Sequence, residues 1–87
     1  MNYVWDVEKA KKNLKKHGVR FSDLEPVFED ERAIEMDDYS SGEPRTVIIG
    51  MDVLARILVV VFVKGEEEFR IISARNAEPR ERKLYLG

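Results

Sequence analysis

Four short runs of strand-forming residues follow one another from Ala33 onward, and they constrain the fold more than any other feature of the chain. The runs are Ala33–Asp38, Arg45–Met51, Ile57–Val63 and Glu68–Ala74. Only short turn-like segments separate them, so we expect consecutive antiparallel strands. The unbroken apolar run Ile57–Val63 predicts a central strand covered on both faces. In the first run, alternation predicts that Ile34 and Met36 point inward.

Helical patterns lie on both sides of these runs. Met1–Trp5 is a short extended entry, and Asp6 is a suitable N-cap for a first helix that runs to about His17. Gly18 is the expected left-handed stop of that helix. Its apolar positions are spaced as on one helical face, and they are predicted to pack on the sheet: Val7, Ala10 and Leu14.

Two further helices complete the pattern. Ser22 to Glu25 resembles a capping box for a short second helix that ends near Asp30. Asn76 is expected to cap a charged last helix, about 77–86, whose apolar contacts would be Ala77, Leu84 and Tyr85. The element order predicts a single α+β domain over residues 1–87, with two N-terminal helices, an antiparallel sheet of about four strands and a C-terminal helix.

The composition bears on the cellular location of this domain and on whether it binds a metal or a cofactor. The chain has 87 residues and no cysteine, which favours a cytoplasmic location over a secreted one. Its longest apolar run is far too short to cross a bilayer, so no membrane association is expected. One His, no Cys and no glycine-rich phosphate loop give no sign of a metal site or a cofactor.

The net charge of −2 hides a strong asymmetry along the chain. Residues 1–20 carry +4, residues 21–43 carry −8, and residues 44–87 carry +2. Bulk charge therefore gives no case for nucleic-acid binding, and any RNA contact must use a local basic patch.

Cationic side chains near the strand ends are the candidates for such a patch. Alternation in the last strand places Arg70 on one face with Ile72 and Ala74, opposite Ser73. The other members of the set are Arg75 at the strand end, Arg45 and Arg56 near the ends of earlier strands, and Arg80 and Tyr85 on the last helix. Such a set could bind phosphates and stabilise a charged transition state.

Each of these residues also has a purely structural interpretation. A surface arginine is commonly solvated or paired with a glutamate, and Tyr85 could simply anchor the last helix. His17 could be a partner of the helix dipole. If one of the two handles a proton, a histidine, with an ordinary pKa near 6.5, suits the task better than a tyrosine near 10.

Three blocks of residues, in order along nearly the whole chain, resemble a known family. The blocks are Trp5-Asp6, Lys9, Asn13, Lys16-His17-Gly18-Val19, Phe21, Val27-Phe28 and Asp30; then Gly42-Glu43, Arg45, Gly50 and Arg56; then Arg70-Ile71-Ile72-Ser73-Ala74-Arg75, Ala77, Glu81-Arg82 and Tyr85. They are similar to the BrnT family of toxins from bacterial type II toxin–antitoxin systems. Near the hairpin, where similar proteins commonly show Thr and Arg, this chain has Val63-Lys64-Gly65.

The resemblance implies a RelE-like fold and an endoribonuclease that cleaves RNA and inhibits growth. From the placement of the cations, we expect catalytic roles for Arg70, Arg75, His17 and Tyr85, and RNA contacts from Arg45, Arg56, Lys64 and Arg80. The implied partner is a BrnA-like ribbon-helix-helix antitoxin that forms a heterotetramer with the toxin and carries it to operator DNA. The alternative is a non-catalytic toxin-fold module that acts only with an antitoxin as a transcriptional co-repressor. The cluster Arg70–Arg75–Tyr85 should be open and electropositive in an enzyme, and paired internally with glutamates in such a module.

Overall fold

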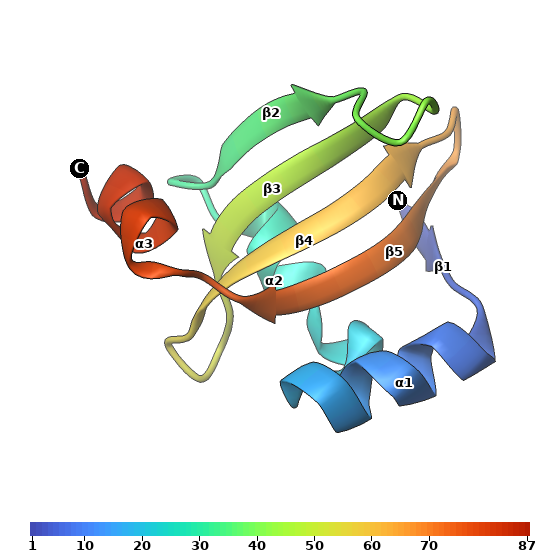
Figure 1. Cartoon of the computed structure of the whole chain (residues 1–87), viewed down its shortest axis with the longest axis horizontal. Helices are drawn as coiled ribbons and strands as arrows, with labels where there is room; N and C mark the ends of the chain where they lie inside the picture. Colours follow the sequence, from blue (N-terminus) through green and yellow to red (C-terminus); the bar gives the residue numbers. More distant parts are fainter.

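A five-stranded sheet forms the centre of the molecule. The computed structural model describes residues 1–87. The strand order is β1-β5-β4-β3-β2, and all pairs are antiparallel except β1 with β5 (Figure 1). The strands are β1 (Asn2–Val4), β2 (Ile34–Asp38), β3 (Arg45–Met51), β4 (Ile57–Lys64) and β5 (Glu68–Asn76). The predicted α+β architecture is confirmed, and the extended entry at the N-terminus is an additional parallel edge strand.

β4 is central, as its apolar run predicted, but its two faces are covered differently. Leu58, Val60 and Phe62 are buried in the main core on the face that carries α1 and α2. On the opposite face, Ile57 and Val59 are buried in a small cluster with Ile49. Further residues of that opposite face are half-buried or exposed, among them Val61, Val63 and Met36. The prediction that Met36 points inward is wrong, because only one end of this face has a cover.

Helix α1 (Val7–His17) begins and ends where the sequence predicted. The Asp6 carboxylate accepts from the Glu8 and Lys9 N–H groups, and Gly18 takes a left-handed φ of 70°. The predicted contact face is partly wrong, since Val7 is 62% exposed and Asn13 is the buried residue of the helix. Asn13 replaces a strand partner at the outer edge of β5: its side chain donates to the Ala74 carbonyl at 2.8 Å and accepts from the Ala74 N–H at 3.0 Å.

A 3-10 turn and a short helix close the main core. The turn η1 (Phe21–Asp23) precedes α2 (Glu25–Glu29). The predicted capping box at Ser22 is wrong, because Leu24 is the N-cap and makes no side-chain cap. α2 packs on β3 at Gly50, where an added Cβ would lie 3.0 Å from the Val27 side chain and carbonyl. Only glycine allows this close approach.

Helix α3 (Pro79–Leu86) covers one end of the face opposite α1 and α2 (Figure 1). Its start differs from the prediction: Asn76 still belongs to β5, and Glu78 is the N-cap, with Glu81 completing a capping box. Tyr85 and Ala77 pack on the Ile49, Ile57 and Val59 cluster as expected. Leu84 does not, since it is 54% exposed. No helix in the structure combines the length and apolar character needed to span a membrane.

Candidate functional site

A β-bulge at Ile72 decides which way the cations of β5 point. Phe62 pairs with Ile71 while its neighbour Val61 pairs with Ser73, so Ile72 is the extra residue. Directly paired residues share a face, which places Ala74 in the main core beside Val60. The predicted alternation of Arg70 with Ala74 is therefore wrong.

The same bulge brings two arginines to one face. Arg70 pairs with Val63 and Arg75 with Val59, both on the face opposite α1 and α2. Residues five apart in a regular strand would point to opposite faces. We call this surface the open face; its members used below are Arg45, Arg70, Arg75, Met36, Val61 and Val63.

Two arginines from different strands converge on one carboxylate at one end of the open face. Glu43 Oε1 lies 3.3 Å from Arg70 Nη2 and 3.7 Å from Arg45 Nε. Arg45 Nε is fully buried and has no hydrogen-bond partner. The pair Arg70–Glu43 is about half exposed, with side-chain exposures of 47% and 49%. The geometry can hold an anion between two guanidinium groups, a position that Glu43 occupies with its own carboxylate.

Arg75 lies at the other end of this face and is fully engaged. Its Nη1 and Nη2 donate to the two carboxylate oxygens of Glu81 at 2.7 and 2.8 Å. The hydrogen bonds from Arg75 lower the pKa of Glu81, although burial opposes the shift. This bidentate pair ties the start of α3 to the end of β5.

Tyr85 is also held by an acid rather than presented to a ligand. Its hydroxyl donates to Asp30 Oδ2 at 2.5 Å, and the same oxygen accepts from the Met51 N–H at 2.9 Å. The hydrogen bond to Asp30, with burial, raises the pKa of Tyr85 above its ordinary 10.0. Tyr85 packs near Val59 and Ile57, whereas Arg70 pairs with Val63, so roughly 13–20 Å of β4 separates them.

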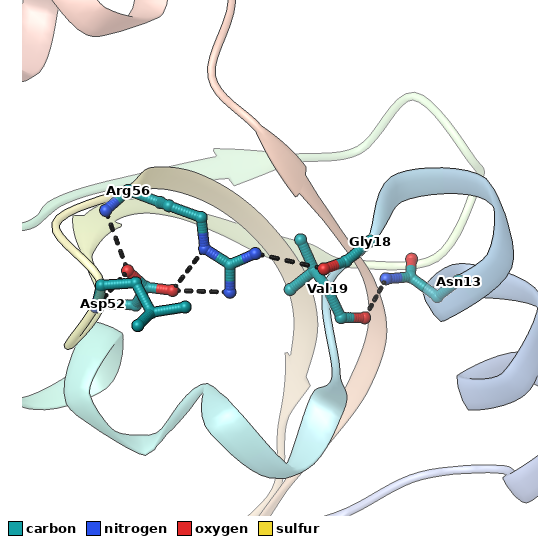
Figure 2. Close-up of polar contacts among 6 residues, drawn as sticks. Asn13, Gly18, Val19, Asp52 and Arg56 are labelled. Atoms are coloured by element: carbon teal, nitrogen blue, oxygen red, sulfur yellow. Dashed lines mark hydrogen bonds and ion pairs between the residues drawn. The ribbon is translucent and has the colours of Figure 1, made fainter.

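Arg56 is part of a buried network between β3, β4 and the end of α1 (Figure 2). Its guanidinium contacts Asp52 Oδ2 through Nη2 at 2.7 Å and Nε at 2.8 Å, and Nη1 donates to the Gly18 carbonyl at 3.1 Å. The Asp52 side chain is 1% exposed. A cation at a helix C-terminus complements the helix dipole, so Arg56 joins the turn after β3 to α1.

The remaining predicted residues lie apart from the open-face arginines. Lys64 binds Glu35 at 2.9 Å, and Arg80 is exposed on α3 without a side-chain partner. His17 is half-buried at the end of α1, a helix that packs on β5 from the opposite side. No group of three or more His, Cys, Asp or Glu side chains is arranged to hold a metal ion. The sequence interpretation missed Glu43 as a partner of the arginines; Gly42-Glu43 just before β3 was its only local signal.

Comparisons with known proteins agree with this architecture. A profile of the family described as "Ribonuclease toxin, BrnT, of type II toxin-antitoxin system" matches residues 5–81. The crystal structure of the Brucella abortus ribonuclease toxin BrnT is similar, with a TM-score of 0.72 and 30% sequence identity over 90% of this chain and 97% of that one. A search of curated proteins found no match. Since the family profile covers most of the chain and the solved relative nearly all of it, the chain belongs to the BrnT family of ribonuclease toxins of type II toxin–antitoxin systems.

Proposed function

We propose that this ribonuclease cleaves RNA at the open face, where Arg45 and Arg70 bind the scissile phosphate. The observation that supports the proposal is the convergence of both guanidinium groups on the single carboxylate of Glu43. When the RNA 2′-hydroxyl loses its proton to water and attacks the adjacent phosphate, the P–O5′ bond breaks, and the products are a 2′,3′-cyclic phosphate and a 5′-hydroxyl that takes a proton from water. In the transition state, negative charge builds up on the phosphate oxygens. Two cations fixed on neighbouring parts of a rigid sheet can stabilise that charge without further reorganisation.

The ion pairs with Glu43 do not prevent this role. Exposed pairs of this kind contribute about 0–1 kcal/mol, so a phosphate group can displace the carboxylate at little cost. A phosphate also accepts bidentate hydrogen bonds from arginine in the same way as a carboxylate. In the proposal, Glu43 occupies the anion position of the free protein and leaves it when RNA binds.

Of the other candidate catalytic residues, only Arg75 has a supporting role in this proposal. Arg75 is on the same face and contacts a neighbouring part of the RNA after exchanging Glu81. Tyr85 and His17 do not reach the pair Arg45–Arg70 in the free protein, since one is bonded to Asp30 and the other belongs to α1. Catalysis therefore rests mainly on charge stabilisation and alignment, and loss of one proton-transfer group weakens it without abolishing it.

Cleavage of a labelled RNA by purified variants tests the proposal. We expect Arg70→Ala and Arg45→Ala each to slow cleavage by about 10²–10³, the usual effect of losing one charge-stabilising donor. Arg82→Ala is the matched control, because Arg82 is an exposed arginine of α3 outside the site. Equal rates for all three folded variants would contradict the proposal.

The ion pairs at Arg70 and Arg75 are also what the alternative, a non-catalytic co-repressor module, would show. The same experiment separates the two functions. If the folded wild-type chain neither cleaves RNA nor slows growth when expressed alone, the binding-module function replaces the ribonuclease function in this protein.

As a type II toxin, the chain has an antitoxin partner. We propose that this partner is a BrnA-like ribbon-helix-helix protein and that it covers the apolar part of the open face. Met36 is 40% exposed there, and Asp38, on the same face of β2, suits a basic partner segment. Co-expression and size-exclusion chromatography test it: Met36→Lys should release the antitoxin, whereas Leu54→Lys, at an exposed loop residue, should not.

The proposed complex is a heterotetramer that binds operator DNA through the antitoxin. Light scattering should then give the mass of two toxin and two antitoxin chains. The complex, but not the toxin alone, should shift an operator fragment in a gel.

A further inference from the structure

A basic hollow lies on the α1 side of the sheet, away from the site proposed above. Its volume is about 180 Å³, and its lining residues are Lys9, Lys12, Asn13, Lys16, His17 and Ile72. The three lysines lie three and four residues apart on α1, which places them on one side of the helix. No acidic residue lines the hollow.

The lysines of this hollow have no ion-pair partner, in contrast to the cations near the strands. Lys9, Lys12 and Lys16 are exposed, and none forms an ion pair in the structure. Arg45, Arg56, Lys64, Arg70 and Arg75 all have a carboxylate partner. α1 therefore carries four lysines without an ion pair, Lys9, Lys12, Lys15 and Lys16, and three of them line the hollow.

The helix dipole does not account for this arrangement. Cations stabilise a helix only within its last turn, which here contains Lys15, Lys16 and His17. Lys9 lies in the first turn of α1, where the dipole disfavours positive charge, and Lys12 lies at the middle of the helix, where the dipole has little effect. A row of free lysines at these positions is better suited to a ligand with several negative charges.

The hollow and the open face meet at the outer edge of β5. β1 pairs with β5 only as far as Arg70, so no strand covers the edge beyond that residue. Asn13 bonds the edge at Ala74, and Ile72, the bulge residue, lines the hollow. Figure 1 shows α1 running alongside this edge. A polymer bound at Arg70 can pass over the edge at Ile72 and reach α1 without crossing another strand.

We propose that the basic hollow of α1 is a second phosphate-binding site, which holds the backbone of a single-stranded RNA on one side of the cleavage point. The inference rests on the proposed ribonuclease function. Lys9, Lys12 and Lys16 contact phosphates as point charges, so the site adds affinity and substrate length but no base preference. A short RNA ends before the hollow, and only a longer one reaches it.

The test uses the whole chain and 2′-O-methyl RNA, which binds but has no 2′-hydroxyl to attack. Single strands of about 4 and about 14 nucleotides bracket the usual length of a single-strand site. The variant is Lys9→Gln/Lys12→Gln/Lys16→Gln. The matched control, Lys11→Gln/Lys15→Gln/Lys83→Gln, removes the same charge from exposed lysines outside the hollow. Binding is measured by fluorescence anisotropy over a range of salt concentrations, and circular dichroism checks each fold.

For the long RNA, we expect the hollow variant to reduce the slope of log affinity against log salt by about 2, since each lost phosphate contact on a single strand removes about 0.7. The control should keep most of the slope, and cleavage of a short unmodified RNA should be unchanged in both. Equal slopes in the two variants, with cleavage intact, would overturn this inference and leave the proposed function standing. Loss of short-RNA cleavage in the hollow variant would place the lysines at the scissile phosphate and would also overturn it. A wild-type chain that neither binds nor cleaves RNA would remove both proposals.

Discussion

The Tyr85 hydroxyl donates a hydrogen bond of 2.5 Å to Asp30, and this contact joins helix α3 to the segment after α2. Burial pushes the pKa of Asp30 up, but the hydrogen bonds from Tyr85, the Met51 N–H and the Arg32 N–H outweigh it and hold that pKa below its ordinary 3.8. α3 buries no residue completely. Its position therefore depends on this bond, on the Arg75–Glu81 pair and on the packing of the Tyr85 ring.

Tyr85→Phe should reduce stability rather than chemistry. Loss of a hydrogen bond to a charged acceptor costs about 1.5–3 kcal/mol in the free energy of unfolding. For a domain of this size each kcal/mol lowers Tm by about 4–8 °C. Thermal unfolding followed by circular dichroism measures the shift. A variant with unchanged Tm and RNA cleavage lowered a hundredfold would instead support a direct catalytic role for Tyr85.

Stability should fall at low pH, with Asp30 as a main contributor. Its pKa is lowered in the folded state, so its contribution is present above the unfolded value of 3.8 and is lost as the pH falls through the folded value. Glu81, also lowered from 4.5, adds to the same acid-side loss. The pKa of Tyr85 is raised above 10.0, so its contribution is complete below pH 10.0 and is lost as the pH rises through the folded value. A plot of Tm against pH should fall both on the acid side and on the alkaline side. In Tyr85→Phe both decreases should be smaller.

Arg56→Ala should destabilise the fold more than it affects RNA contact. Removal of the guanidinium leaves Asp52 Oδ2, on a side chain that is 1% exposed, without its charged partner, while Oδ1 keeps the backbone N–H groups of residues 54 and 56. Breaking a buried pair in this way costs about 3–5 kcal/mol. Urea unfolding measures the loss, and the double variant Arg56→Met/Asp52→Asn should recover part of it, because it removes the charge but keeps an Oδ1 acceptor for the backbone N–H groups of residues 54 and 56. If Arg56→Ala is fully stable but binds RNA poorly, Arg56 is an RNA-contacting residue.

Asn13→Ala should be among the most destabilising single changes in α1. Asn13 is 7% exposed and makes hydrogen bonds to the Ala74 N–H, the Ala74 carbonyl and the Val19 carbonyl. Buried backbone groups left without partners cost about 1–3 kcal/mol each, so we expect a loss of at least about 2 kcal/mol by urea titration. Asn76→Ala is the control, because Asn76 is exposed and Glu78 caps α3. A loss of similar size in both variants would contradict the role given to Asn13.

Glu43→Gln should strengthen RNA binding. The change removes the carboxylate that competes with phosphate for Arg45 and Arg70. Because exposed pairs are worth about 0–1 kcal/mol, the gain in kcat/KM should be about two- to fivefold at low salt. Cleavage assays over a salt series measure it, with Glu66→Gln at the exposed hairpin tip as control. A drop in kcat would mean that Glu43 takes part in the reaction or holds the arginines in place.

The sequence by itself determined most of the local elements and the family. Asp6 and Gly18 set the ends of α1 because capping depends on residues within one turn. The strand runs set β2 to β5, and the apolar run Ile57–Val63 identified the central strand, because burial on two faces leaves no polar position. The residue blocks also sufficed for the family, which the comparisons confirmed.

Only the tertiary structure decided how the candidate site is arranged. The two-residue alternation of side chains in a strand does not reveal an extra residue. The bulge at Ile72 therefore depends on the pairing of β4 with β5, and this bulge turns Arg70 and Arg75 to one face. The Asn13–Ala74 contact joins residues 61 positions apart, and the Arg70–Glu43 pair joins residues 27 positions apart. The Asn13 contact has no local signal, and Gly42-Glu43 before β3 does not by itself indicate which arginine Glu43 meets. The division between paired arginines and free lysines on α1 therefore follows from the packing of distant elements, and not from the pattern of the chain.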